Sequence, residues 1–104
     1  MGDIIVKNKR TYKGPGIYIG RPSIFGNPFA MKTEADRADV IERYHEWLKD
    51  MYQHDQLIHD ELHRLADMKD DIILICWCAP KPCHGDVIKE AILSLRQYNA
   101  IKAL

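Results

Sequence analysis

The sequence predicts a small α/β domain, in which a short, mostly parallel sheet is flanked by helices in a three-layer-like sandwich. Short β-branched runs alternate with stretches whose apolar residues recur at helical spacing. The strongest strand, over 72–77, is an uninterrupted apolar run of the kind that is covered on both faces. The 104 residues fit a single domain, 1–104, and contain no linker, internal repeat or low-complexity tract.

The first half of the chain predicts two strands followed by two helices. Residues 4–6 (Ile-Ile-Val) and 17–19 (Ile-Tyr-Ile) are β-branched runs, separated by a Gly/Pro turn signal. Thr33 is expected to cap a helix whose apolar residues recur at intervals of three and four, and a second amphipathic stretch follows. A break near 54–55 separates two helices, with one kinked helix as the alternative.

The second half predicts strand 72–77 and, after a proline-bounded turn, a closing helix over 86–97. If strand 17–19 runs parallel to strand 72–77, the two helices between them form a right-handed crossover. Ligands of such sheets bind beyond the carboxyl ends of the strands. The segments that follow those ends, 20–29 and 78–86, are therefore expected to converge on one rim and to form a binding site.

The first rim loop, Gly-Arg-Pro-Ser-Ile-Phe-Gly-Asn-Pro-Phe, combines side chains that suit a nucleotide-like ligand. Its glycines permit close backbone approach, its arginine matches a phosphate, and its aromatic rings can stack on a flat base. The predicted ligand-binding residues of this loop are Gly20, Arg21, Ser23, Phe25, Gly26, Asn27 and Phe29. A rigid loop whose aromatic rings fill a small core is the purely structural alternative.

The second rim loop brings reactive side chains to the predicted start of the closing helix. Cys83 is a candidate nucleophile, because a helix N-terminus stabilises a thiolate, and His84 and Asp86 are candidate acids or bases. A second interpretation is that the backbone N–H groups of His84, Gly85 and Asp86 bind an anion. Asp86 then either contacts a ribose hydroxyl or base, or serves only as a helix cap.

A zinc-stapled interaction module is the alternative function. Cysteine and histidine are zinc ligands, and four of them lie within nine residues: Cys76, Cys78, Cys83 and His84. Their C-x-C-x4-C-H spacing is not that of a common zinc knuckle, and adjacent Cys83 and His84 cannot easily share one ion. No cofactor is therefore predicted, with zinc as the exception to test.

Charge and composition narrow the range of partners. Residues 1–32 hold six basic residues and one acidic residue, whereas the rest of the chain holds nine and fourteen. This basic front end suits a phosphate-bearing ligand but is too weak for non-specific nucleic-acid binding. No apolar run is long enough to cross a membrane, no signal peptide is evident, and three clustered cysteines suit a reducing cytoplasm. The small core and apolar rim suit a homodimer.

Three motifs together resemble one protein family. YIGRPSIFGNPF at 18–29, YHEWL at 44–48 and CWCAPKPCHGDVI at 76–88 are similar to the motifs of the family called domain of unknown function 4326, short proteins of bacteria and their phages. The resemblance spans about 16–97 and implies a shared site at these positions: Arg21, Ser23, Gly26, Asn27, Cys83, His84, Gly85 and Asp86. The family is similar to small nucleotide-handling α/β domains, which is an analogy of fold. Its occurrence in phages suits a role in nucleotide metabolism or in countering nucleotide-based host signalling.

The leading hypothesis is therefore a small cytoplasmic α/β domain that binds a nucleotide, or a related phosphorylated or ribosylated small molecule, at the rim. If the domain is also an enzyme, hydrolysis or glycosyl transfer on that nucleotide is the expected class of reaction.

Overall fold

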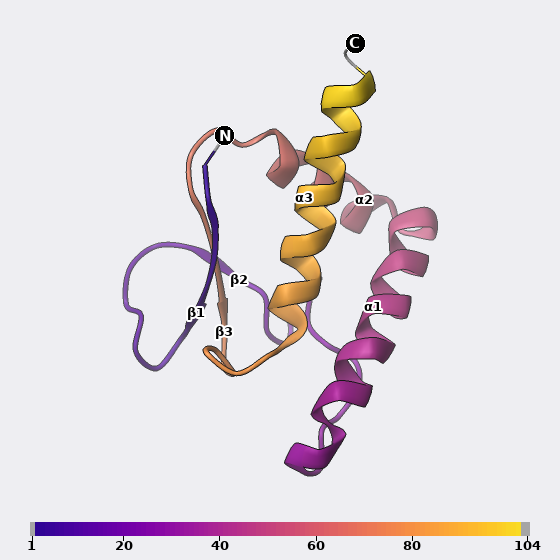
Figure 1. The fold of residues 1–104 in the computed structure, drawn as a ribbon. Helices are drawn as coiled ribbons and strands as arrows, with labels where there is room; N and C mark the ends of the chain where they lie inside the picture. Colours follow the sequence, from indigo (N-terminus) through magenta and orange to yellow (C-terminus); the bar gives the residue numbers. More distant parts are fainter. Residues whose placement is uncertain (1, 103–104) are drawn as a thin grey trace.

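The computed structural model describes residues 2–102, which form three strands packed against three helices (Figure 1). The strands are β1 (Ile4–Asn8), β2 (Ile17–Tyr18) and β3 (Ile72–Cys76). The helices are α1 (Arg37–His54), α2 (Gln56–Asp67) and α3 (His84–Lys102), with a short 3₁₀ helix, η1 (Glu34–Asp36), before α1. The predicted α/β class is confirmed. No helix within the described residues is long and apolar enough to cross a membrane.

The sheet is entirely parallel, in the order β1-β3-β2. Ile4 of β1 lies opposite Ile72 of β3, and Ile17 of β2 lies opposite Leu74. The helices α1 and α2 connect β2 to β3, whereas only the loop 9–16 connects β1 to β2. The predicted parallel pairing is confirmed, and it brings the carboxyl ends of β2 and β3 to the same edge of the sheet.

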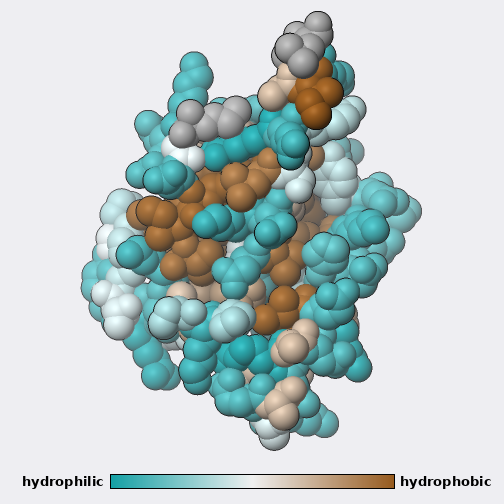
Figure 2. Space-filling model, viewed as in Figure 1, coloured by the Kyte–Doolittle hydropathy of each residue, from teal (hydrophilic) through white to brown (hydrophobic). Residues whose placement is uncertain are grey.

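Alternation along β3 determines which face of the sheet is covered by helices. Ile72, Leu74 and Cys76 are buried in one core with residues of all three helices, whereas Ile73 and Ile75 are only half-buried. In Figure 1 the helices lie together on one side of the strands, and the loop 9–16 swings away from them. Figure 2 shows apolar side chains gathered over the strands and beside α3, with polar side chains over α1. One sheet face therefore meets the helices and the other meets a loop.

The helix boundaries follow from local capping. Asp55 has an extended backbone and accepts the Ile58 N–H at 3.1 Å, so α1 and α2 are two separate helices, as the predicted break indicated. Thr33 caps η1 rather than α1, and its N–H donates to the Asp36 carboxylate at 3.2 Å. The closing helix extends beyond the predicted 86–97 at both ends, from His84 to Lys102, and the apolar residues of its last turns, Tyr98 and Ile101, are exposed.

Arg96 joins three segments at the amino-terminal edge of the sheet. It is the only buried charged residue of the described chain. Its guanidinium donates to the carbonyl of Gly2 at 2.9 Å, to that of Ala66 at 3.3 Å and to that of Met68 at 3.4 Å. One cation of α3 thus satisfies main-chain acceptors from the start of the chain and from the end of α2.

Arg96→Met is expected to lower the free energy of unfolding by about 1–3 kcal/mol, because it leaves buried carbonyl groups without a donor. Urea denaturation followed by circular dichroism measures the change. The matched control is Gln97→Met, an exposed position of the same helix, which is expected to change stability by less than about 0.5 kcal/mol. Equal stability of the two variants would show that the Arg96 contacts carry no stabilisation.

Candidate ligand-binding site

A cavity of about 350 Å³ opens at the carboxyl ends of β2 and β3. Small-molecule sites typically enclose about 300–1,000 Å³, so the cavity has the size of a ligand pocket. Both predicted rim loops contribute to its wall, together with the first turns of α1. The lining residues are Tyr18, Gly20, Arg21, Asn27, Phe29, Met31, Arg37, Val40, Ile41, Trp77, Cys78, Pro82, Cys83 and His84. The predicted convergence of the two loops is therefore present in the structure.

Arg21 holds the first rim loop in an arch. Its Nε donates to the Asn27 carbonyl at 2.7 Å, and its Nη2 donates to the Phe29 carbonyl at 3.3 Å. The Asn27 side-chain oxygen in turn accepts the Phe29 N–H at 2.8 Å. The guanidinium remains exposed, and no hydrogen bond of its Nη1 occurs within the described residues. Arg21 is thus fixed by the loop while one nitrogen stays available to a ligand.

Phe25 belongs to the core rather than to the cavity. Its side chain is 2% exposed, and its carbonyl accepts the buried Tyr44 hydroxyl of α1 at 2.7 Å. The Phe25 ring is therefore not accessible for stacking on a ligand, and of the two predicted rings only that of Phe29 lines the cavity. For Phe25 the alternative interpretation, an aromatic ring that fills the core, is therefore the correct one.

Ser23 and Gly26 shape the loop from behind the cavity wall. Neither residue lines the cavity, and the Ser23 hydroxyl is buried with no hydrogen-bond partner in the described chain. A Cβ on Gly26 would lie 3.0 Å from the Arg21 Cα and 3.1 Å from the Ser23 carbonyl oxygen. Glycine at this position therefore lets the loop close tightly around Arg21.

The first turn of α3 is capped by the chain's own groups. Cys83 precedes the helix, and its sulfur accepts the Gly85 N–H at 3.3 Å. The Asp86 carboxylate accepts the Cys83 N–H at 3.1 Å, and the Asp86 N–H donates to the Cys83 carbonyl at 3.0 Å. The Asp86 carboxylate thus makes the contact of the third residue in a capping box, and the Cys83 sulfur caps the second N–H of the helix, as a serine or threonine oxygen can do.

The cap changes the roles expected of Gly85 and Asp86. Their N–H groups, predicted to bind an anion, are already hydrogen-bonded within the chain. Gly85 is buried, and a Cβ there would lie 3.0 Å from side-chain carbons of Val6 and Ile19. Asp86 borders a separate hollow beside β1, together with Lys89, and not the 350 Å³ cavity. Neither residue therefore reaches a ligand held in that cavity, and Asp86 acts as a helix cap.

His84 is the predicted acid–base residue that does line the cavity. Its Nε2 donates to the Ile19 carbonyl at 2.7 Å, and its ring lies edge-on to Tyr44 at 5.0 Å. Burial lowers the pKa of His84 below its ordinary value of 6.5. Because a carbonyl can only accept, the neutral ring carries its proton on Nε2. Its Nδ1 is therefore the atom that can accept a hydrogen bond or a proton.

Two of the three cysteines form a buried pair. The sulfur atoms of Cys76 and Cys83 are 3.5 Å apart, and the Cys83 thiol donates to Cys76. This hydrogen bond lowers the pKa of Cys76 to about 6 and, together with burial, raises the pKa of Cys83. Cys83 is therefore held as a thiol, which opposes the nucleophilic role predicted for it. Only Cys78 is half-buried on the cavity wall.

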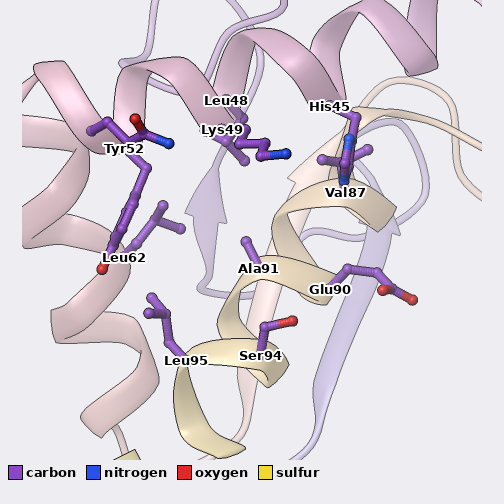
Figure 3. A pocket seen from close by; sticks show the side chains of 11 residues that line it. His45, Leu48, Lys49, Tyr52, Leu62, Val87, Glu90, Ala91, Ser94 and Leu95 are labelled. Carbon is purple, nitrogen blue, oxygen red and sulfur yellow. The ribbon is translucent and has the colours of Figure 1, made fainter. Parts of the chain in front are cut away.

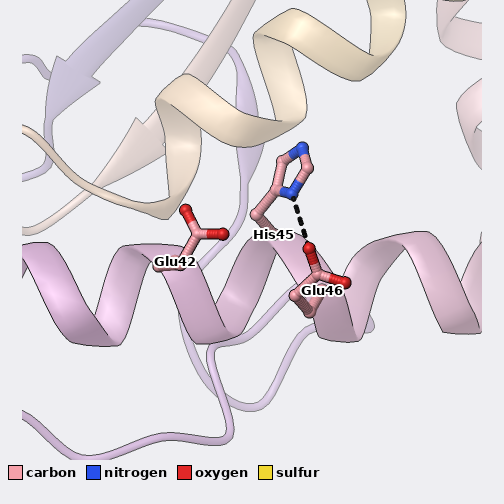
Figure 4. Close-up of side chains that lie close together, drawn as sticks. All are labelled: Glu42, His45 and Glu46. Carbon is pink, nitrogen blue, oxygen red and sulfur yellow. Dashed lines mark ion pairs between the residues drawn. The ribbon is translucent and has the colours of Figure 1, made fainter.

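The four residues of the predicted zinc staple do not converge. Within residues 2–102, the one group that brings three potential ligand atoms within 4.8 Å of one another is Glu42, His45 and Glu46 (Figure 4). These side chains lie exposed on α1, where the His45 Nδ1 is 3.6 Å from the Glu46 carboxylate. The Nε2 of His84 is meanwhile occupied by the Ile19 carbonyl. The geometry therefore gives the zinc staple no support.

Seven lining residues were missed by the sequence analysis, and three of them, Tyr18, Arg37 and Trp77, make side-chain hydrogen bonds at the cavity wall. The Tyr18 hydroxyl donates to the Arg21 carbonyl at 3.0 Å and accepts the Trp77 Nε1–H at 2.9 Å. Arg37 donates to the Pro82 carbonyl at 2.8 Å and makes a two-pronged ion pair with Glu34, at 2.9 Å for each bond. The signal available for Tyr18 and Trp77 was their alternation with the buried residues of short strands.

An interhelical cavity of about 250 Å³ lies between the three helices (Figure 3). Side chains of all three helices surround it, among them Tyr52 of α1, Leu62 of α2 and Ala91 of α3. None of the predicted site residues lines it. The candidate site is therefore the 350 Å³ cavity at the carboxyl ends of β2 and β3.

The family model described as Domain of unknown function (DUF4326) matches residues 4–94, which include both rim loops. The chain therefore belongs to this family, and the predicted membership is confirmed. No curated protein and no solved structure matches the chain. The site geometry accordingly carries the functional argument.

Thiol titration with Ellman's reagent is expected to label Cys78 rapidly in the native protein and the other two cysteines only after unfolding. The reason is access, because Cys76 and Cys83 are 0% and 3% exposed. Cys78→Ser removes the rapid phase if the assignment is correct. Rapid labelling of more than one thiol would contradict the buried pair.

The stability of the protein is expected to fall as the pH drops below about 6.5, the ordinary pKa of histidine, because unfolding frees His84 to take up a proton. The folded pKa lies below the unfolded one, so this contribution is present above the unfolded pKa and is lost as the pH falls. Urea denaturation at several pH values measures it. His84→Gln should flatten the dependence, and the exposed His45→Gln should leave it intact. An unchanged slope in His84→Gln would refute the assignment.

Proposed function

We propose that this DUF4326 domain binds a nucleotide, or a related phosphorylated and ribosylated small molecule, in the 350 Å³ cavity. The observation that carries the proposal is the composition of one wall, on which two arginines stand beside aromatic side chains from segments far apart in the sequence. Guanidinium groups match phosphate oxygens, and aromatic rings stack on bases. A nucleotide carries both complementary parts.

Arg21 is the proposed phosphate ligand. The charge of Arg37 is paired with Glu34, and its nitrogen atoms are engaged by that carboxylate and by the Pro82 carbonyl. Arg21 has no ion pair within residues 2–102. Two carbonyl groups of its own loop fix its guanidinium and leave the Nη1 atom free to donate to a ligand. The sequence analysis assigned phosphate binding both to Arg21 and to the N–H groups at the start of α3. We now assign it to Arg21 alone, because the N–H groups of Gly85 and Asp86 are hydrogen-bonded within the chain.

Aromatic and polar groups around Arg21 suit the rest of a nucleotide. Trp77 is 50% exposed and Phe29 is half-buried, so both rings offer surface to a base. The Asn27 amide NH₂ makes no hydrogen bond in the described chain and can donate to a base edge. The Nδ1 of His84 can accept from a ribose hydroxyl, and it is the one group through which we propose that any turnover of the bound nucleotide would proceed, as a general base.

The cellular setting is part of the same proposal. All three cysteines are free thiols, which fits a reducing compartment such as the cytoplasm. A bacterial or phage origin and a homodimer stay predictions from the sequence.

Arg21→Ala is expected to weaken nucleotide binding by about tenfold or more, because a charge-assisted contact to phosphate is lost. Isothermal titration calorimetry with adenosine, guanosine, cytidine and uridine 5′-monophosphates, and with ribose 5-phosphate, tests it. The control is Arg43→Ala, which removes an exposed guanidinium paired with Asp39 on α1. Thermal melting verifies that both variants fold. Equal affinity of Arg21→Ala and the unaltered protein would reject the assignment, as would the absence of binding by every nucleotide.

A further inference from the structure

We propose that the ligand contains two phosphate-linked nucleotide units, and that the second unit occupies a hollow on the far side of Trp77. This proposal rests on the function proposed above. The hollow has a volume of about 410 Å³ and lies where the loop 9–16 meets the outer face of β3. Its walls come from Lys9, Arg10, Tyr12, Lys13, Ile75 and Trp77, with Gly14.

Trp77 joins the two hollows. It is the one residue that lines both of them, and half of its surface is exposed. Its Nε1–H donates to the Tyr18 hydroxyl at 2.9 Å, and that hydroxyl donates to the Arg21 carbonyl at 3.0 Å. The indole is therefore held in a fixed orientation between the phosphate site at Arg21 and the second hollow. A base stacked on it would lie between the cavity wall that carries Arg21 and the hollow that carries Lys9 and Lys13.

The second hollow is positively charged and therefore suits an anionic ligand. Three cations line it, no acidic side chain does, and residues 4–33 contain no aspartate or glutamate. None of the three cations forms an ion pair within residues 2–102. The Lys9 ammonium lies 5.2 Å from the centre of the Tyr18 ring, which places it beside the pair formed by Tyr18 and Trp77. Uncompensated cations in a concave surface attract phosphate.

The second hollow also offers a stacking surface. The Tyr12 hydroxyl donates to the Pro15 carbonyl at 2.7 Å, which fixes the half-buried ring within the loop 9–16. Figure 1 shows this loop swung out from the strands on the side away from the helices, and no helix residue lines the hollow. Aromatic rings and cations that alternate along a surface are typical of proteins that bind successive nucleotides. The two cavities beside Trp77 would each hold one nucleotide unit. The net charge of the chain is zero, which disfavours non-specific binding to long nucleic acids.

The test compares one nucleotide with two. The probes are adenosine 5′-monophosphate, the 5′-phosphorylated dinucleotide pApA and a 5′-phosphorylated oligoadenylate, with the base replaced by the one preferred in the first titration. The dinucleotide should bind about tenfold more tightly than the mononucleotide, because one more base stacks and one more phosphate is neutralised. Lys9→Ala/Lys13→Ala should abolish this advantage while the affinity for the mononucleotide stays unchanged. The control is Lys49→Ala/Lys102→Ala, in which two exposed lysines of the helices are removed.

The outcomes separate the two proposals. If no mononucleotide or dinucleotide binds the unaltered protein, the proposed function itself fails. If the mononucleotide binds and the dinucleotide is no tighter, or if its advantage survives in Lys9→Ala/Lys13→Ala, only the second unit is refuted. The oligoadenylate identifies the source of the ligand. Binding equal to that of the dinucleotide indicates the end of a single strand, weaker binding indicates a free dinucleotide, and both results support a ligand with two units.

Discussion

The candidate site depends on how closely the first turn of α3 approaches the sheet. Gly85 makes this approach feasible, because side-chain carbons of β1 and of Ile19 occupy the space around its missing Cβ. With the helix seated there, the sulfur of Cys83 reaches Cys76, and the imidazole of His84 reaches the carbonyl of Ile19. A single close contact between helix and sheet thus sets the floor of the cavity, the state of the thiol pair and the tautomer of the histidine.

The cysteine-rich segment is therefore explained by architecture more than by reactivity. Cys76 ends the central strand and Cys83 caps the last helix, so their contact joins the two elements that flank the tight turn between them. The same turn presents Trp77 and Cys78 to the cavity. The composition of this segment suggests a metal site, but the segment forms a fixed turn between β3 and α3 that positions part of the cavity wall.

Periodicity and apolar runs predicted the strands and the two central helices, because these elements are encoded by neighbouring residues. The parallel pairing of β2 and β3 was predicted by the helical crossover between them. The roles of individual rim residues depend on distant partners and were harder to predict. Phe25 and Phe29 have similar glycine- and proline-rich surroundings in the sequence, yet Tyr44 of α1 draws only the segment at Phe25 into the core. Arg37 looked like an ordinary helical residue, because Pro82, its carbonyl partner, lies far along the chain. Local pattern therefore located the cavity but did not decide which side chains face it.

The Arg96 contacts have a consequence for the order of folding. Arg96 and Gly2 are 94 positions apart in the chain, and β1 has no partner until β3 is in place. Contacts of such long sequence separation close late, because the entropy of closing the loop opposes them until the intervening segments are ordered. During synthesis on the ribosome, β1 therefore has no strand partner until β3 has emerged, and the Gly2 carbonyl has no Arg96 donor until α3 is present. The described strands and helices are therefore expected to fold as one cooperative unit once α3 has been synthesised, rather than strand by strand.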